Sequence, residues 1–326
     1  MLSRVAESLY WMARYIERAE NLTRAWAVNY YARLEAQQGG EPPWQAVVAL
    51  TGGGGSPLSV WTDATAAEFM LWHPSNPSAV ASCVGRAREN ARSVREQISS
   101  EMWEHVNRLY FYLRDVDRKA AVREPYELFR QVREGSHAFQ GITAATMNHG
   151  EGYLFMELGR LLERATLTVR LLAVRYAEAR RLDDGTASGS LHLMALLKSV
   201  SAFEAFRKLQ AAPLQASAVA EFLLLSAEFP RAVRFCIGEA LDAVKAIAAD
   251  GPRSDARGDR VQRALGPIRA DLDYLDVEAV LDERLVPYLE QLLGRIHKVG
   301  EEIESTCFST HVVLPAPRVE QAQQQQ

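Results

Sequence analysis

The sequence predicts an all-α protein, a helical bundle built from two tandem, pseudo-symmetric repeats with about twelve helices. Apolar residues recur at spacings of three and four along most of the 326 residues, and we find no run of strict apolar-polar alternation typical of a strand. The tripeptide Glu-Arg-Ala occurs at residues 17–19 and again at 163–165, which indicates an internal repeat. With 48% apolar residues, the chain can bury a sizeable core.

The first helix is predicted from Ser3, a suitable N-cap, to about Gln37. The Gly39-Gly40 and Pro42-Pro43 pairs predict its end. One stripe of this helix is apolar or small, at spacings of three and four, which places these residues on a single face: Val5, Leu9, Met12, Ile16, Ala19 and Thr23.

The remaining helices follow from periodicity and from cap residues such as Asn76 and Ser99. They are predicted at Pro77 to about Ile98, Ser100 to about Lys119, Pro125–Met147, Tyr153–Leu182, Leu191–Leu209, Ala216–Ser226, Pro230–Ala249 and Val277 to about Cys307, the last with a kink at Pro287. Glycine-rich loops are expected at Gly52–Gly55 and Asp183–Gly189, and a disordered tail at residues 309–326.

The repeat extends well beyond the tripeptide. An offset of 146 residues relates Arg14, Glu17, Arg18, Ala19 and Arg24 to Arg160, Glu163, Arg164, Ala165 and Arg170. An offset of 153 relates Phe69, Pro77 and Cys83 to Phe222, Pro230 and Cys236, and an offset of 160 relates His137 to His297. Slowly growing offsets are expected of a duplicated unit with small insertions, so repeat one is placed at about 1–150 and repeat two at about 151–308, packed as one bundle.

Charge and composition exclude several classes of function. The net charge of −4, with Lys and Arg spread along the chain, gives no reason to expect nucleic acid or an anionic membrane as partner. Charged residues at positions 4, 7 and 14 are incompatible with a signal-peptide core or a membrane span, so a cytoplasmic location is expected. The three cysteines, Cys83, Cys236 and Cys307, have no CxxC spacing and are predicted to be reduced.

Metal and nucleotide sites are not expected in this chain. Glu134-x-x-His137 has the spacing of a di-iron ligand pair, but its counterpart at His297 has Gly294 instead of glutamate. Zinc motifs and phosphate-binding loops are absent from the sequence, and the glycine run Gly52–Gly55 is followed by Ser-Pro rather than Lys-Ser/Thr. If ATP and Mg²⁺ are used, they are expected on a partner protein.

The two Glu-Arg helices carry the candidate functional residues. On a helical wheel the charged side chains gather opposite the apolar stripe, and three interpretations remain open: an exposed face with local ion pairs, two charged faces that meet as a buried polar core, or a groove whose arginines bind a carboxylate or phosphate. The candidates for substrate or partner binding are Arg14, Glu17, Arg18, Arg160, Glu163 and Arg164, followed by Glu7, Trp11 and Arg24.

Five segments of the chain, MLSRVAESLYWMARYIERAEN, SSEMWEHVN, FMELGRLLERA, SVSAFEAFR and FLLLSAEFPRAVRFC, resemble the bacterial alpha-E domain family over residues 1–308. In that family the domain occurs beside, or fused to, a circularly permuted ATP-grasp protein, often near transglutaminase-like proteins. The resemblance implies an accessory subunit of a peptide- or amide-forming system that positions an amino-acid or peptide substrate, or the ligase itself. Two alternatives remain: an independent helical transferase or hydrolase with Glu17 or Glu163 as base, and a purely structural scaffold.

Overall fold

The computed structural model describes residues 1–35, 44–52, 61–181, 187–209, 214–250, 256–277 and 284–308. These residues form fourteen α-helices and one π-helical turn, with no strand among them, which confirms the all-α class. Several predicted features lie outside the described residues: the Gly39-Gly40 and Pro42-Pro43 stop, the loop beyond Gly52, residues 182–186 and the tail at 309–326.

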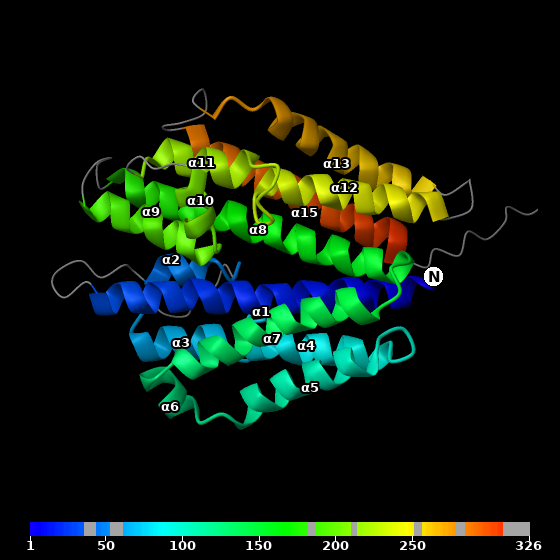
Figure 1. Cartoon of the computed structure of the whole chain (residues 1–326), viewed down its shortest axis with the longest axis horizontal. Helices are drawn as coiled ribbons and strands as arrows, with labels where there is room; N and C mark the ends of the chain where they lie inside the picture. The colour runs from blue at the N-terminus through cyan, green and yellow to red at the C-terminus, as the bar shows by residue number, and fades with distance from the viewer. Residues whose placement is uncertain are drawn as a thin grey trace, which may run out of the picture.

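Two long helices, α1 (Ser3–Glu35) and α8 (Glu151–Arg181), lie side by side at the centre of the molecule (Figure 1). They run parallel, because contacts near the start, middle and end all join residues 145–150 positions apart, as in Met1–Glu151, Arg18–Glu163 and Asn29–Arg175. Every residue of the predicted apolar stripe of α1 is buried.

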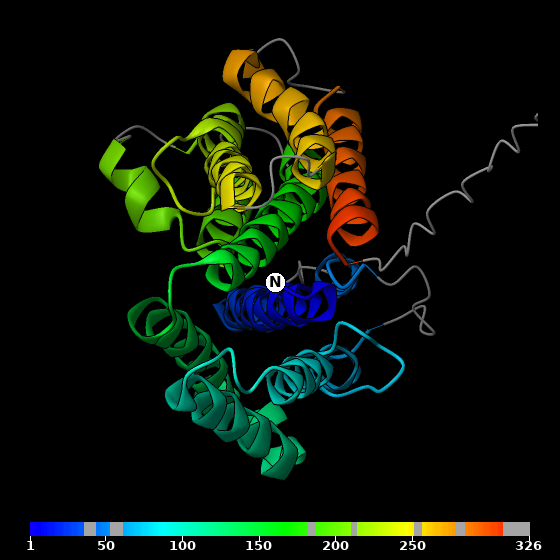
Figure 2. The same cartoon turned by 90° about the vertical axis from the view of Figure 1, so that its right-hand side faces the viewer.

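Each central helix has its own set of neighbours. Helices α4 (Val80–Ser93) and α7 (Tyr126–Thr146) pack on α1, and α5 (Ser100–Asp115) packs on both of them. The same order recurs around α8, where α12 (Val233–Asp250) and α15 (Leu285–Ile303) pack on α8 and α13 (Ala256–Tyr274) packs on both. Figure 2 shows the two sets on opposite sides of α1 and α8. Duplication of an ancestral unit stays a prediction, with which this order agrees.

Short helices complete the bundle. They are α2 (Trp44–Ala49), α3 (Asp63–Leu71), α6 (Arg118–Arg123), α9 (Ala187–Ser199), α10 (Phe203–Leu209), α11 (Ala216–Leu225) and the π-helical turn η2 (Glu304–Phe308) that continues α15. One large apolar core includes side chains from both halves, such as Trp26 of α1, Leu162 of α8 and Leu292 of α15. The two halves therefore share a core.

Three details of the predicted helices were wrong for local reasons: a break, a start and a kink. The helix predicted at Leu191–Leu209 is two helices, because Ser201 adopts a left-handed conformation (φ 53°) and the Ala202 amide donates to the Leu197 carbonyl, closing α9. Residues 187–189, predicted as loop, begin α9. Pro287 does not kink a helix: it is the third residue of α15, where no intrahelical amide donor is needed.

Helix α13 was missed by the sequence analysis. Its buried residues follow a helical spacing, at Val261, Leu265, Ile268 and Leu272, but Pro267 stands among them, and proline is disfavoured in the interior of a helix. Asn76 was also misplaced as an N-cap: its side chain accepts from the Ser78 amide and donates to the Phe69 carbonyl, and α4 begins only at Val80. In contrast, Ser99 caps α5 as predicted, accepting from the Met102 amide.

Candidate functional site

Glu163 of α8 joins the two central helices. Arg18 of α1 donates through Nε to Glu163 Oε1 (2.6 Å) and through Nη2 to Oε2 (2.9 Å), which is bidentate pairing. Arg14 donates through Nε to Glu163 Oε2 (2.9 Å) and through Nη1 to the Tyr10 hydroxyl (3.0 Å). Glu163 is only 2% exposed, so one buried carboxylate holds two guanidinium groups.

Glu17 of α1 has the reciprocal arrangement. Arg164 of α8 donates through Nε to Glu17 Oε1 (2.7 Å) and through Nη2 to Oε2 (3.2 Å). Asn21 donates to Oε1 (3.2 Å) and Gln140 of α7 donates to Oε2 (2.7 Å). The glutamate of each copy of the motif therefore pairs with the second arginine of the other copy.

A second acidic residue of α1, Glu20, extends these contacts. Its side chain is fully buried and accepts from Arg231 Nη2 (3.0 Å) and from Arg24 Nη2. Arg231 stands just before α12 and also lies 3.3 Å from Glu17 Oε1. These ion pairs form two clusters, one around Glu163 and one around Glu17 and Glu20. We call their eight side chains together the interhelical network: Arg14, Glu17, Arg18, Glu20, Arg24, Glu163, Arg164 and Arg231.

The interhelical network rules out an exposed charged face and favours a buried polar core. An exposed face with local ion pairs is wrong, since Glu17 and Glu163 are buried and their partners come from the other helix. The two faces meet as a buried polar core. Burying ion pairs costs desolvation, but geometry of this kind satisfies the charges and fixes how the helices align.

Electrostatics keeps the network carboxylates ionised. Burial alone would raise the pKa of Glu163, but Arg18 and Arg14 outweigh it and lower that pKa to about 2. Burial opposes the same effect at Glu17, where Arg164 and Arg231 hold the carboxyl pKa below its usual range. Glu20 is likewise held below its usual pKa, against burial, by Arg231 and by hydrogen bonding to His137.

Not all predicted site residues join the network. Arg160 pairs with Glu157 on its own helix, through Nε at 3.0 Å from Glu157 Oε1. Glu7 is exposed at the surface of α1. Trp11 is half-buried beneath the Arg14 guanidinium, 4.8 Å from the ring centroid, and stacks on Tyr15.

An arginine-histidine contact occurs once in each half. Arg24 Nη2 lies 3.4 Å from His137 Nε2, and Arg170 Nη2 lies 3.2 Å from His297 Nε2. The 146-residue offset relates Arg24 to Arg170, and the 160-residue offset relates His137 to His297, so the two contacts are equivalent in the repeat. The first contact includes a carboxylate, since Glu20 Oε1 lies 3.6 Å from His137 Nε2.

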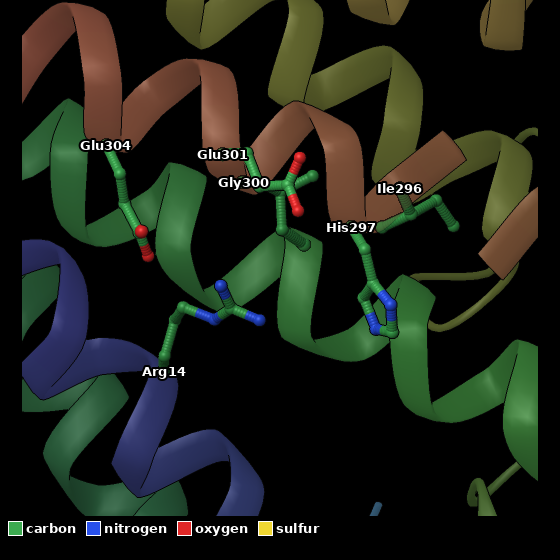
Figure 3. Close-up of a pocket in the computed structure, with 7 residues that line it drawn as sticks. Arg14, Ile296, His297, Gly300, Glu301 and Glu304 are labelled. Atoms are coloured by element: carbon green, nitrogen blue, oxygen red, sulfur yellow. The ribbon is translucent and has the colours of Figure 1, made fainter. Parts of the chain in front are cut away.

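A pocket of about 250 Å³ opens beside the network, between α1, α8, α15 and η2. Figure 3 shows the Arg14 side chain pointing from α1 toward this pocket, with Glu301, Glu304 and His297 around it. Leu162, Ile296 and Gly300 complete its lining. Of the sequence-predicted candidates, Arg14 alone lines this pocket. The guanidinium groups of Arg18 and Arg164 instead donate hydrogen bonds to Glu163 and Glu17, respectively.

No group of three or more His, Cys, Asp or Glu side chains that could hold a metal ion occurs in the described ranges. Glu134, half of the di-iron spacing, instead accepts from Arg130. Among the described helices none has the length and apolarity to span a bilayer.

The sequence analysis did not include among its candidates several residues of the interhelical network, its hydrogen-bond partners and the two arginine-histidine contacts: Glu20, Asn21, His137, Gln140, Arg170, Arg231 and His297. Glu20 lies within the first Glu-Arg segment. The 146-residue offset aligns it with Thr166, so the sequence already shows a charged residue in one copy where the other copy has none. The 153-residue offset likewise aligns Arg231 with Ser78. The Glu20–Arg231 ion pair therefore has no charged counterpart in the other half, and this difference is visible in the aligned segments.

Comparison with known proteins gives a family and distant relatives. The model of the Alpha-E family, described as a predicted alpha-helical domain with a conserved ER motif, matches residues 1–308. Uncharacterized proteins of Mycobacterium bovis (strain ATCC BAA-935 / AF2122/97) and of Mycobacterium tuberculosis (strains CDC 1551 / Oshkosh and ATCC 25618 / H37Rv) are 25% identical over 337 residues. The alignment covers 96% of this chain but 37% of each relative, so the chain spans about a third of their length. No solved structure matches significantly.

Proposed function

We propose, from the premise that the chain belongs to the Alpha-E family, that it is an accessory subunit of an ATP-grasp-dependent system that forms peptide or amide bonds in the cytoplasm. ATP and Mg²⁺ would bind to a circularly permuted ATP-grasp partner, with a transglutaminase-like protein as a further partner. The chain would position an amino-acid or peptide substrate, or the ligase.

The observation that carries this proposal is the length of the mycobacterial relatives. The domain makes up 37% of each relative, so most of each of those polypeptides lies outside it. A domain that occurs as one part of longer chains is suited to act together with other domains. This supports an accessory role for the separate chain.

The network argues against Glu17 or Glu163 as the base of an independent enzyme. A general base must reach a proton of the substrate and have a pKa near the working pH. Both carboxylates are buried, occupied by arginine donors and held at lowered pKa values. Their chemistry suits a helix-aligning ion pair.

Binding is proposed at Arg14, because its guanidinium lines a pocket while it also pairs with Glu163. The other network residues would hold α1 and α8 in the alignment that places Arg14. On this view reversing the charge of Arg18 and Arg164 destroys the fold, and such variants cannot report on substrate binding.

The proposal is tested by co-expressing the chain with a circularly permuted ATP-grasp protein. ATP turnover is followed against a panel of amino acids and peptides, with the ligase alone, the chain alone and both together. Turnover that requires both proteins is expected. A stable complex with unchanged turnover would favour the structural scaffold, and turnover by the chain alone would favour an independent enzyme.

A further inference from the structure

The two arginine-histidine contacts differ in one respect. On one side, the Glu20 carboxylate accepts from Arg24 and lies beside His137. On the other side, position 166 is threonine, and no carboxylate contacts Arg170 among the described residues. Arg170 instead donates to the Leu50 carbonyl at 3.5 Å and to His297.

Among the buried and partly buried side chains of this second side, positive charges outnumber negative ones. Three guanidinium groups, those of Arg14, Arg18 and Arg170, act on the single buried carboxylate of Glu163. Burial lowers the pKa of Arg170, and Arg18 and Arg14 lower it further against the opposing effect of Glu163. An added anion here would relieve repulsion among like charges.

His297 connects this positive cluster to the pocket. Since arginine only donates, His297 Nε2 accepts from Arg170, which leaves the ring proton on Nδ1 as a donor. His297 and Arg14 both line the pocket, so two donors border one space. Arg170 itself is not part of the lining and acts on the ring of His297.

The opposite wall of the pocket is acidic. Glu301 and Glu304 lie on α15 and η2, one helical turn apart, and both line the pocket with Arg14. Glu301 makes no ion pair within the described part of the chain. A volume of about 250 Å³ falls below the roughly 300–1,000 Å³ of pockets for drug-sized ligands, so it suits a single small molecule.

We propose that this pocket binds a free α-amino acid, whose carboxylate lies against Arg14 and His297 and whose ammonium group lies against Glu301. As Glu20 does beside His137, the ligand carboxylate places a negative charge beside the histidine of the arginine-histidine contact. Leu162 and Ile296 offer an apolar surface to the ligand side chain. The biological meaning of this inference rests on the proposed function, but its test does not, because binding is measured with the chain alone.

The test uses the isolated full-length chain with ¹³C-labelled histidine. Each of the common L-amino acids is titrated separately, with acetate and ethylamine as fragments that carry only one of the two charges. The resonance of His297 is assigned by its loss in His297→Gln. We expect one or more amino acids to shift this resonance and to bind at least about tenfold more tightly than either fragment, because charged hydrogen bonds contribute on that scale.

The pKa of His297 gives a second readout. In the free protein burial, Arg170 and Arg14 lower this pKa, and Glu163 and Glu301 oppose them. A bound carboxylate favours the protonated ring, so the pKa is expected to rise on binding. His137→Gln is the matched control: it removes the equivalent ring of the other half, which does not line the pocket, and should leave the affinity unchanged. His297→Gln has lost the reporting ring, so its affinity is measured by isothermal titration calorimetry, and it should bind about tenfold more weakly.

A pair of glycine variants separates binding from folding. A methyl group added at Gly300 would enter the pocket 3.8 Å from Arg14 Nη1, an ordinary contact. One added at Gly294 on the same helix meets nothing within 4 Å. Both Gly→Ala changes favour the helix, so neither should lower stability, and only Gly300→Ala should weaken binding.

The inference is overturned if no amino acid shifts His297, if acetate binds as tightly as the amino acids, or if Gly294→Ala and Gly300→Ala bind equally. Its failure is distinguishable from failure of the proposed function. Amino-acid binding without an effect on ligase turnover removes the accessory role alone, and chain-dependent turnover without binding to the isolated chain removes the pocket alone.

Discussion

At the residue scale, Glu163 determines how α1 and α8 meet, because Arg14 and Arg18 both depend on its carboxylate. Glu163→Gln keeps the size of the side chain and removes its charge, leaving two largely buried guanidinium groups without it. Breaking a buried pair of this kind costs about 3–5 kcal/mol. Urea unfolding followed by circular dichroism should show a loss of that order.

The matched control for this change is Glu134→Gln on α7. Glu134 accepts from Arg130 at 3.0 Å, but its side chain is 54% exposed. Exposed pairs contribute about 0–1 kcal/mol. Equal losses for the two variants would show that the interhelical network does not stabilise the fold.

The two cysteines that face the network are expected to be unreactive. Burial raises the pKa of both Cys83 and Cys236 to about 12, against the opposing effect of Arg18 and Arg164 respectively. Because the thiolate is the nucleophile, iodoacetamide should modify neither residue in the native protein and both after unfolding. Mass spectrometry of the digested protein measures which cysteines are alkylated. Labelling of either residue in the native protein would contradict its burial.

At the scale of elements, the approach of the α1 backbone to α8 requires glycine at position 159. A methyl group at Gly159 would overlap the Tyr10 carbonyl oxygen of α1, so Gly159→Ala must push the two helices apart. Such overpacking typically costs about 1–3 kcal/mol. The same change at Gly141, on exposed α7 surface with nothing within 4 Å, should instead stabilise by about 0.5–1 kcal/mol.

Thermal unfolding of the two alanine variants measures this difference directly. Opposite signs are expected, with a lower midpoint for Gly159→Ala and a higher one for Gly141→Ala. A raised midpoint for both would mean that helix propensity outweighs the contact, and that the crossing is looser than described.

The sequence predicted most of the long helices, but it predicted less well where each helix begins and ends. The long amphipathic helices around α1, α7 and α8 agree with their predicted spans within a few residues. The errors fall where local chemistry overrides periodicity: Ser201 takes a left-handed conformation that its sequence does not demand, and Pro267 sits inside α13. Neither feature changes the apolar spacing on which the prediction depended.

At the scale of the whole molecule, stability should fall in acid. The pKa of Glu163 is about 2 in the folded state, compared with about 4.3 for an unperturbed glutamate. A lowered folded-state pKa gives stability that is complete above the unfolded value and is lost as pH falls toward the folded value. The urea midpoint should therefore decline from about pH 5 to about pH 2.

Glu163→Gln is the control for this pH dependence, because it cannot take up the proton. Its urea midpoint should decline less steeply over the same range than that of the parent chain. The difference should persist in salt, since buried pairs are screened less than exposed ones. Identical slopes would contradict the role of Glu163 in acid unfolding.

The candidate site was predictable in its members more than in its arrangement. The motif spacing identified Arg14, Glu17, Arg18, Glu163 and Arg164, yet a helical wheel shows only the face that a residue occupies. Which helix covers that face is a property of the packed bundle. The pocket was not predictable, since it combines Arg14 with residues of α15 almost three hundred positions later.

The parallel alignment of α1 and α8 has a mechanical consequence. Their cross-links lie at successive levels along a common axis, from Arg18–Glu163 and Arg164–Glu17 to Arg175–Asn29. A pull that slides one helix lengthwise past the other strains all of these links together, whereas a pull that peels the helices apart meets them one at a time. The pair should therefore resist shearing far better than peeling.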